Sequence, residues 1–199
     1  MTDDRRRGKG GRAVKGATLF RVNARSYRRM AVAGDFGDTK VELLGGALTV
    51  MTTGPVHDYV VGTLHYLLLD RLGRVDRTVR EEKPLNLGWF WRPLPDIAVV
   101  RGHRTSHAHR PPGRHDVALL VEVADTSYAV DAGRKLRRYL ACGIPAYWII
   151  DVNRRRVEVR DMRSPDGSAP ATTYTEGAAV PLTLDGRDHG TVAVADLFA

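Results

Sequence analysis

Two carboxylates and one lysine are the side chains in this sequence best suited to carry out a reaction. Asp96 precedes the apolar run 97–100, and Glu122 lies inside the apolar run 117–124. An ionised carboxylate in such a run is costly unless it is paired or binds a cation. Two carboxylates from neighbouring strands can share one divalent ion, and Mg²⁺ commonly takes one or two carboxylates with waters and a phosphate. Such an ion can activate a water and stabilise charge during phosphate hydrolysis.

Lys135 borders the apolar stripe of a predicted helix over 131–142. From there its ammonium group can reach back toward Glu122. Each residue also has a structural interpretation, in which Asp96 is a strand-entry residue bonded to backbone and Glu122 pairs with an arginine. Lys135 would then lie at the edge of the apolar stripe of its helix, with its charged end in water. The three residues together favour a site.

The elements that must position these residues alternate between helices and strands, which predicts an α/β fold with helices packed on a mixed sheet. Within a strand alternate side chains share a face, so Asp96 is expected beside Ala98 and Glu122 beside Leu120. Helices are predicted over 26–33, with Ser26 as N-cap, 56–72 and 131–142. Strands are predicted over 41–44, 47–51, 74–87, 96–100, 117–124, 146–151 and 156–161, followed by a β-leaning C-terminal segment.

Length and composition exclude several classes of protein. The 199 residues suit one domain, which we place at 18–199, and the 43% hydrophobic and 27% charged fractions exclude wholesale disorder. The single cysteine, Cys142, excludes an internal disulfide and a cysteine-rich zinc framework. No apolar run approaches the roughly 18 residues of a membrane span, and the N-terminus lacks the pattern of a signal peptide. We therefore expect a cytoplasmic protein.

The formal net charge of +8 invites a nucleic-acid interpretation, but its distribution limits that argument. Residues 1–29 hold the whole excess of basic over acidic side chains, and the rest of the chain is balanced. Residues 1–17 are predicted to be a disordered basic arm. The arm is either a solvated tail or a polyanion-binding segment, in which case the contacts would come from Arg5, Arg6, Arg7, Lys9 and Arg12.

A histidine-rich loop precedes the second carboxylate strand and contains His103, His107, His109 and His115. Such a tract can bind zinc, which would suit a zinc-binding regulatory protein. The histidine spacing fits no standard closed site, and nearby arginines repel a cation. A polar loop, able to touch a DNA backbone, is the favoured interpretation.

A succession of motifs then becomes recognisable along residues 26–161. In order, they are 42–46 (ELLGG), Met51, His57, 95–100 (PDIAVV), 120–124 (LVEVA), Asp131 with Lys135 and Tyr139, and 143–151 (GIPAYWIID). This succession resembles the Uma2 family of bacterial restriction endonucleases, within the PD-(D/E)XK nuclease superfamily. The resemblance implies a restriction-endonuclease-like core and metal-dependent hydrolysis of DNA phosphodiester bonds.

The resemblance also implies roles for individual residues. Asp96 and Glu122 would be the metal ligands, for Mg²⁺ or alternatively Mn²⁺. The superfamily's usual lysine position is Ala124 here, and Lys135 matches the family's lysine on the following helix. His57 and Glu42 match positions at the edge of the site.

Two departures, the first from the superfamily's pattern and the second from the family's, keep a second hypothesis open. Ala124 replaces the usual lysine, and the loop 125–128 reads DTSY where the family has Ser-Pro-Ser. The first hypothesis is a Mg²⁺-dependent endodeoxyribonuclease, expected to work as a homodimer because two cuts need two sites. The second is a catalytically degenerate nuclease scaffold that binds nucleic acid or another partner.

Overall fold

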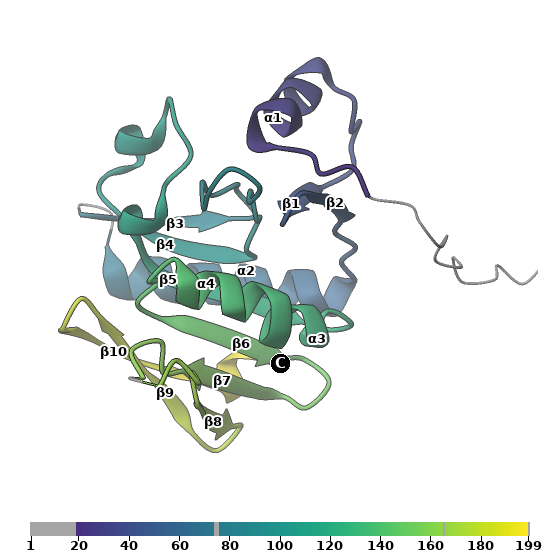
Figure 1. Cartoon of the computed structure of the whole chain (residues 1–199). Coiled ribbons are helices and arrows are strands. Elements are labelled where there is room, and N and C mark those ends of the chain that lie inside the picture. Colours follow the sequence, from purple (N-terminus) through teal and green to yellow (C-terminus); the bar gives the residue numbers. More distant parts are fainter. Residues whose placement is uncertain (1–18, 74–75, 165, 199) are drawn as a thin grey trace, which may run out of the picture.

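The computed structural model describes residues 19–73, 76–164 and 166–198. Its centre is a six-stranded mixed sheet flanked by helices, which confirms the predicted α/β architecture (Figure 1). The β5–β6 pair is parallel, and the other neighbouring pairs of this sheet are antiparallel. In spatial order the strands are β3 (Arg77–Glu81), β4 (Ile97–Arg101), β5 (Val117–Ala124), β6 (Tyr147–Asp151), β7 (Arg156–Arg160) and β8 (Ala171–Thr175).

Helices cover both faces of the sheet (Figure 1). Helix α2 (Pro55–Leu72) packs Leu64 and Leu68 into a core that includes Ile97 and Val121. The other face is covered by a helix in three parts: α3 (Tyr128–Val130), a π-helical turn (Asp131–Lys135) and α4 (Leu136–Ala141). There Tyr139 packs with Ala98 and Leu120. The expected alternation is confirmed from Leu119 to Ala124, but a bulge at the start of β5 places Ala118 on the α2 side instead of beside Leu120.

Smaller elements extend this core. Strands β1 (Val41–Leu44) and β2 (Ala47–Val50) form the predicted hairpin, and its turn needs positive φ angles of 56° at Gly45 and 90° at Gly46. Strands β9 (Ala179–Leu184) and β10 (Arg187–Ala193) form a second hairpin, which contributes Val180 and Val192 to the α2-side core. Short 3₁₀ turns occur at Arg104–His107, Arg114–Asp116 and Ala195–Leu197.

The structure corrects several predicted boundaries. Helix α1 (Ala24–Ala33) begins earlier than expected, because Asn23 caps it by accepting a hydrogen bond from the Ser26 backbone N–H at 2.9 Å. The one or two strands predicted over 74–87 are reduced to β3, since Glu82 has a positive φ of 47° and Pro84 follows it. Asp96 lies one residue before β4 instead of inside a strand.

The remaining helix boundaries concern the site. The helix predicted over 131–142 begins at Tyr128 and contains the π turn.

The basic arm 1–17 lies outside the described residues. Within the portion of the chain that is described, no helix combines the length and apolar character needed to cross a membrane.

Candidate active site

Strands β4 and β5 bring the two predicted carboxylates side by side. Their antiparallel register pairs Ile97 with Val121, and one further step places Asp96 opposite Glu122. Both residues are buried, with exposed fractions of 3% and 1%. The Val123 backbone N–H donates to Oδ2 of Asp96 at 2.6 Å, which fixes that carboxylate against the neighbouring strand.

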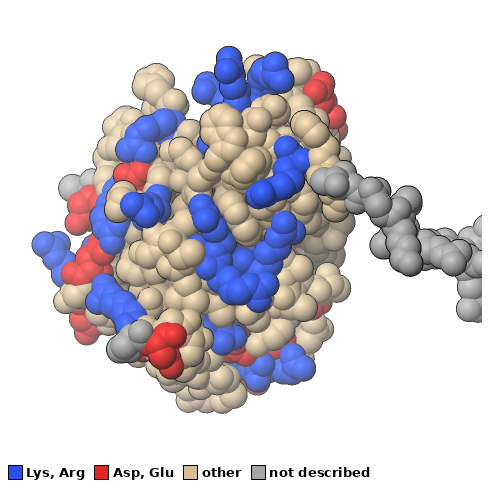
Figure 2. All heavy atoms as spheres, in the orientation of Figure 1, with Lys and Arg blue, Asp and Glu red and all other residues tan. Residues whose placement is uncertain are grey.

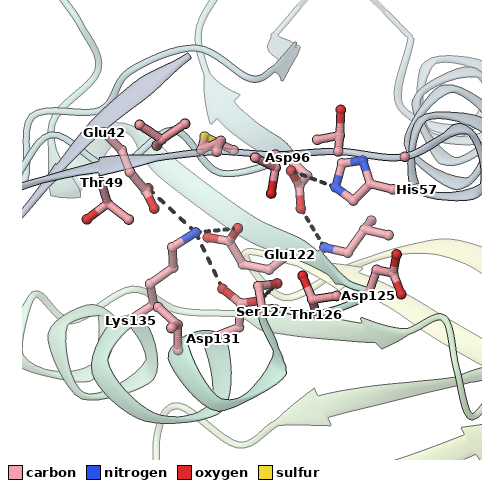
Figure 3. Close-up of a pocket in the computed structure, with 17 residues that line it drawn as sticks. Glu42, Thr49, His57, Asp96, Glu122, Asp125, Thr126, Ser127, Asp131 and Lys135 are labelled. Atoms are coloured by element: carbon pink, nitrogen blue, oxygen red, sulfur yellow. Dashed lines mark hydrogen bonds and ion pairs between the residues drawn. The ribbon is translucent and has the colours of Figure 1, made fainter. Parts of the chain in front are cut away.

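Lys135 reaches these carboxylates from the π turn (Figure 3). Its Nζ lies 2.9 Å from Oε2 of Glu122 and 3.5 Å from Oε2 of Glu42, and 3.4 Å from Oδ1 of Asp131. Figure 3 shows the lysine side chain extending from its helix into this group of acids. The structure therefore brings Asp96, Glu122, Lys135 and Glu42 together, as the sequence analysis expected.

The π turn aligns three side chains along one side of the helix. Asp131, Lys135 and Tyr139 are spaced four residues apart, and in a regular α-helix positions eight residues apart drift by about 80° around the axis. The wider π turn, with its i→i+5 pattern, offsets part of this drift. As a result Tyr139 also reaches the site, where its hydroxyl donates to Oε1 of Glu122 at 2.7 Å.

His57 enters from the first turn of α2 and contacts the other carboxylate. Its Nε2 lies 3.2 Å from Oδ1 of Asp96, and its Nδ1 lies 3.2 Å from Oδ1 of Asp58. Burial lowers the pKa of His57, but the hydrogen bonds and charges of these two acids outweigh burial and raise it above its usual value. His57 thus bridges Asp96 and Asp58 through its two ring nitrogens.

The buried group carries more acid than base. Glu42, Asp96, Glu122 and Asp131 face the ammonium of Lys135 and the imidazole of His57. Burial is the main cause that raises the pKa of Glu122 well above its usual value, and it also raises the pKa values of Glu42 and Asp131; Lys135 opposes each increase. The three acids overcome the effect of burial on Lys135 and raise its pKa, so the lysine is charged.

These side chains line one cavity of about 200 Å³. Its remaining wall comes from the segment 49–54, which leads into α2, and from the loop 125–127 after β5. Val50 and Val130, both exposed, also line it. The cavity is small and acidic, as expected for a site that takes a cation together with part of a larger substrate.

The chemistry of this cavity fits a divalent cation. Its donors are carboxylate oxygens, which Mg²⁺ prefers, and the buried Oδ1 of Asp131 pairs with Nζ of Lys135 at 3.4 Å but accepts no further hydrogen bond among the described residues. In the described part of the chain, no three His, Cys, Asp or Glu side chains form a preassembled ligand group. Mg²⁺ needs only one or two carboxylates from the protein, because waters and substrate phosphate complete its shell.

Sequence reasoning did not assign two members of this group. Asp131 and Tyr139 appeared only within the motif succession, yet Asp131 contacts Lys135 and accepts a 2.5 Å hydrogen bond from the Ser127 hydroxyl. The useful signal was the spacing of Asp131, Lys135 and Tyr139, which repeats every four residues.

The histidine-rich loop lies apart from this group. Nε2 of His107 lies 2.9 Å from the Arg101 carbonyl oxygen, and the ring of His103 contacts Thr105 within the loop. None of the four loop histidines lines the acidic cavity. The zinc-binding alternative gains no ligand group from the described residues.

Comparison with known proteins agrees with this geometry. The sequence model of the Uma2 family, described as "Putative restriction endonuclease", matches residues 24–193. The chain belongs to the Uma2 family. The match includes all of the clustered residues, from Glu42 to Tyr139, and supports a nuclease function.

A solved structure shares the fold. It is the crystal structure of a putative nuclease of the family DUF820 from Anabaena variabilis, with a TM-score of 0.62 and 15% sequence identity. The alignment covers 79% of the Uma2 chain described here and 89% of the Anabaena chain. No curated protein matches the sequence.

Proposed function

We propose that this Uma2 protein is a Mg²⁺-dependent endonuclease that hydrolyses DNA phosphodiester bonds. The observation that carries the proposal is the convergence of Asp96, Glu122 and Lys135 on one cavity, with Nζ of Lys135 2.9 Å from Glu122. Family membership supports the reaction class.

Asp96 and Glu122 are the residues that would hold the ion, with Asp131 beside them. When bound, a divalent cation supplies charge stabilisation at the phosphate and lowers the pKa of a water. His57 and the Val123 N–H orient Asp96 through contacts to its two oxygens. Tyr139 similarly fixes Oε1 of Glu122.

Lys135 acts as a charged donor, because the surrounding acids raise its pKa. An ammonium group carries three donor hydrogens and no acceptor, so it can orient a water or stabilise negative charge on phosphate, but it cannot remove a proton. The acids with raised pKa values, Glu42 and Asp131, are the groups suited to accept the proton of the attacking water.

A plasmid-nicking assay tests this proposal. Wild type, Asp96→Ala and Lys135→Ala are incubated with supercoiled DNA in Mg²⁺, in Mn²⁺ and in EDTA. Asp70→Asn and Lys83→Ala, at exposed positions outside the cavity, are the matched controls. We expect nicking by wild type and both controls, loss in both site variants, and loss in EDTA.

Equal nicking by all proteins indicates a contaminating nuclease and refutes the assignment. Absence of nicking by pure wild type on supercoiled, linear and single-stranded DNA also refutes it. In that case the degenerate-scaffold hypothesis, motivated by Ala124 and the altered 125–128 loop, becomes the better explanation. We further propose a homodimer for double-strand cleavage, which sedimentation of the protein with and without DNA would test.

A further inference from the structure

A groove rich in arginine lies outside the catalytic cavity. Two adjoining cavities of about 630 and 640 Å³ share Asn86 and Arg110 and run between α1, the segment 84–92, the loop 107–116 and α4. We call this surface the arginine groove. Its basic lining consists of Arg28, Arg80, Arg92, Arg110, Arg114 and Arg138.

The arginine groove has little negative charge of its own. Asp116 is the one acid among the described residues lining it, and it pairs with Arg110 at 2.7 Å. Figure 2 shows Lys and Arg side chains over α1, over the adjacent loops and over α4, with most carboxylates toward the margins of this face. The balanced charge of the body is therefore unevenly distributed over its surface.

Four of the six arginines in this groove fall into two kinds. Arg92 and Arg138 donate to backbone carbonyls of the segment 84–92, including those of Gly88 and Leu87, and so hold that segment in place. Arg28 and Arg114 are exposed, and neither pairs with an acid among the described residues. The exposed pair is available to an external anion.

Arg80 adds a partly buried positive charge to the lining of the groove. Its Nε is buried without a hydrogen-bond partner in the described structure, and burial lowers its pKa without any acid to counter the effect.

The groove is close to the catalytic cavity. Arg92 and Leu43 exchange backbone hydrogen bonds of 2.8 and 3.0 Å, and the neighbouring Glu42 lines the cavity. The acidic cavity by itself repels a polyanion, so a phosphate-rich substrate needs a cationic surface beside it. We propose that the arginine groove binds the sugar–phosphate backbone of DNA flanking the catalytic cavity, a choice of ligand that rests on the proposed nuclease function.

Binding is measured on the full chain by fluorescence anisotropy with labelled duplex DNA in EDTA, across a salt series. The test protein is the double variant Arg28→Gln/Arg114→Gln, both at exposed positions, and Arg187→Gln on β10 is the matched control. Each lost phosphate contact lowers the slope of log affinity against log salt by about 1, so the double variant should lose about 2 and bind all sequences more weakly. The control should behave as wild type.

An unchanged affinity and salt slope in a folded double variant overturns the inference. Heparin that binds wild type as tightly as DNA at equal charge overturns the choice of nucleic acid. Plasmid nicking measured in parallel separates the two proposals. If wild type never cuts DNA but its binding depends on Arg28 and Arg114, the nuclease function is refuted and the groove assignment stands. If wild type cuts DNA but its binding is independent of both arginines, the groove assignment is refuted and the nuclease function stands.

Discussion

Replacing Lys135 with methionine should destabilise the protein in a manner that depends on pH. Methionine approximates the length of the lysine stem, so packing against the sheet is largely kept. The change leaves Glu42, Glu122 and Asp131 without the ammonium that lies 2.9 to 3.5 Å from their oxygens. Removing one partner of a buried ion pair typically costs about 3–5 kcal/mol, because the remaining charge is uncompensated.

Protonation of the acids limits this cost at low pH. The pKa of Glu122 in the folded protein already lies above the usual value of 4.5, mainly because of burial, and losing Lys135 raises it further. A carboxyl group whose folded-state pKa is raised binds more protons in the folded than in the unfolded state, so its destabilising effect grows as pH rises above the unfolded value. We expect a loss of about 3 kcal/mol near pH 8 and less than half of that near pH 5.

Urea unfolding in EDTA, followed by tryptophan fluorescence, to which the buried Trp148 contributes, measures the loss without interference from metal. Lys83→Met is the matched control at an exposed lysine and should change stability by less than about 0.5 kcal/mol. A loss that is the same at both pH values, or a loss in the variant no larger than in the control, would refute the electrostatic account of the buried cluster.

Three further predictions use the same measurement. Tyr139→Phe should cost about 1.5 kcal/mol, since it removes a 2.7 Å hydrogen bond to a buried carboxylate, and an unaltered midpoint would contradict that role. Mg²⁺ should raise the unfolding midpoint of wild type but not of Asp96→Asn, because a ligand that binds only the folded state stabilises it; equal shifts in both would exclude Asp96 as a ligand. Asp185, whose pKa is lowered from 3.8 to about 2 by Arg101 above all, should contribute about 1 kcal/mol above pH 4, after allowance for its partial exposure. Asp185→Asn should therefore be less stable at neutral pH, and the difference should disappear as pH falls through about 2.

The three central residues of the candidate site were predictable because their signals are local. A carboxylate beside or within an apolar run is conspicuous wherever it occurs, and this identified Asp96 and Glu122. Their convergence followed from strand adjacency, which the β4–β5 register confirms. Lys135 was identified by its position on a helix stripe, which depends on spacing alone.

The features of the site and surface that the sequence did not predict depend on contacts between segments far apart in the chain. The contribution of Asp131 to the buried acids becomes visible only once β1 and β5 surround its helix with Glu42 and Glu122. The arginine groove joins residues of α1 and α4, which are far apart in the sequence. A count of charges by region of the sequence did not reveal it, because acids elsewhere in the chain balance these arginines. Composition reports how many charges a chain has, whereas function depends on which of them the fold gathers.

The π turn has a consequence for how this helix tolerates insertions and deletions. Tyr128 and Glu158 are hydrogen bonded before the turn, and Tyr139 and Glu122 after it, so both ends of the helix are fixed to the sheet. A one-residue deletion at Ala132 or Gly133 would let the intervening segment close into a regular α-helix while both anchors remain. Lys135 would stay one turn before the anchored Tyr139, whereas Asp131, now three residues before the lysine instead of four, would be displaced relative to it along and around the helix. The length of the segment 128–139 therefore sets the pairing of Asp131 with Lys135, just as the identity of the lysine does.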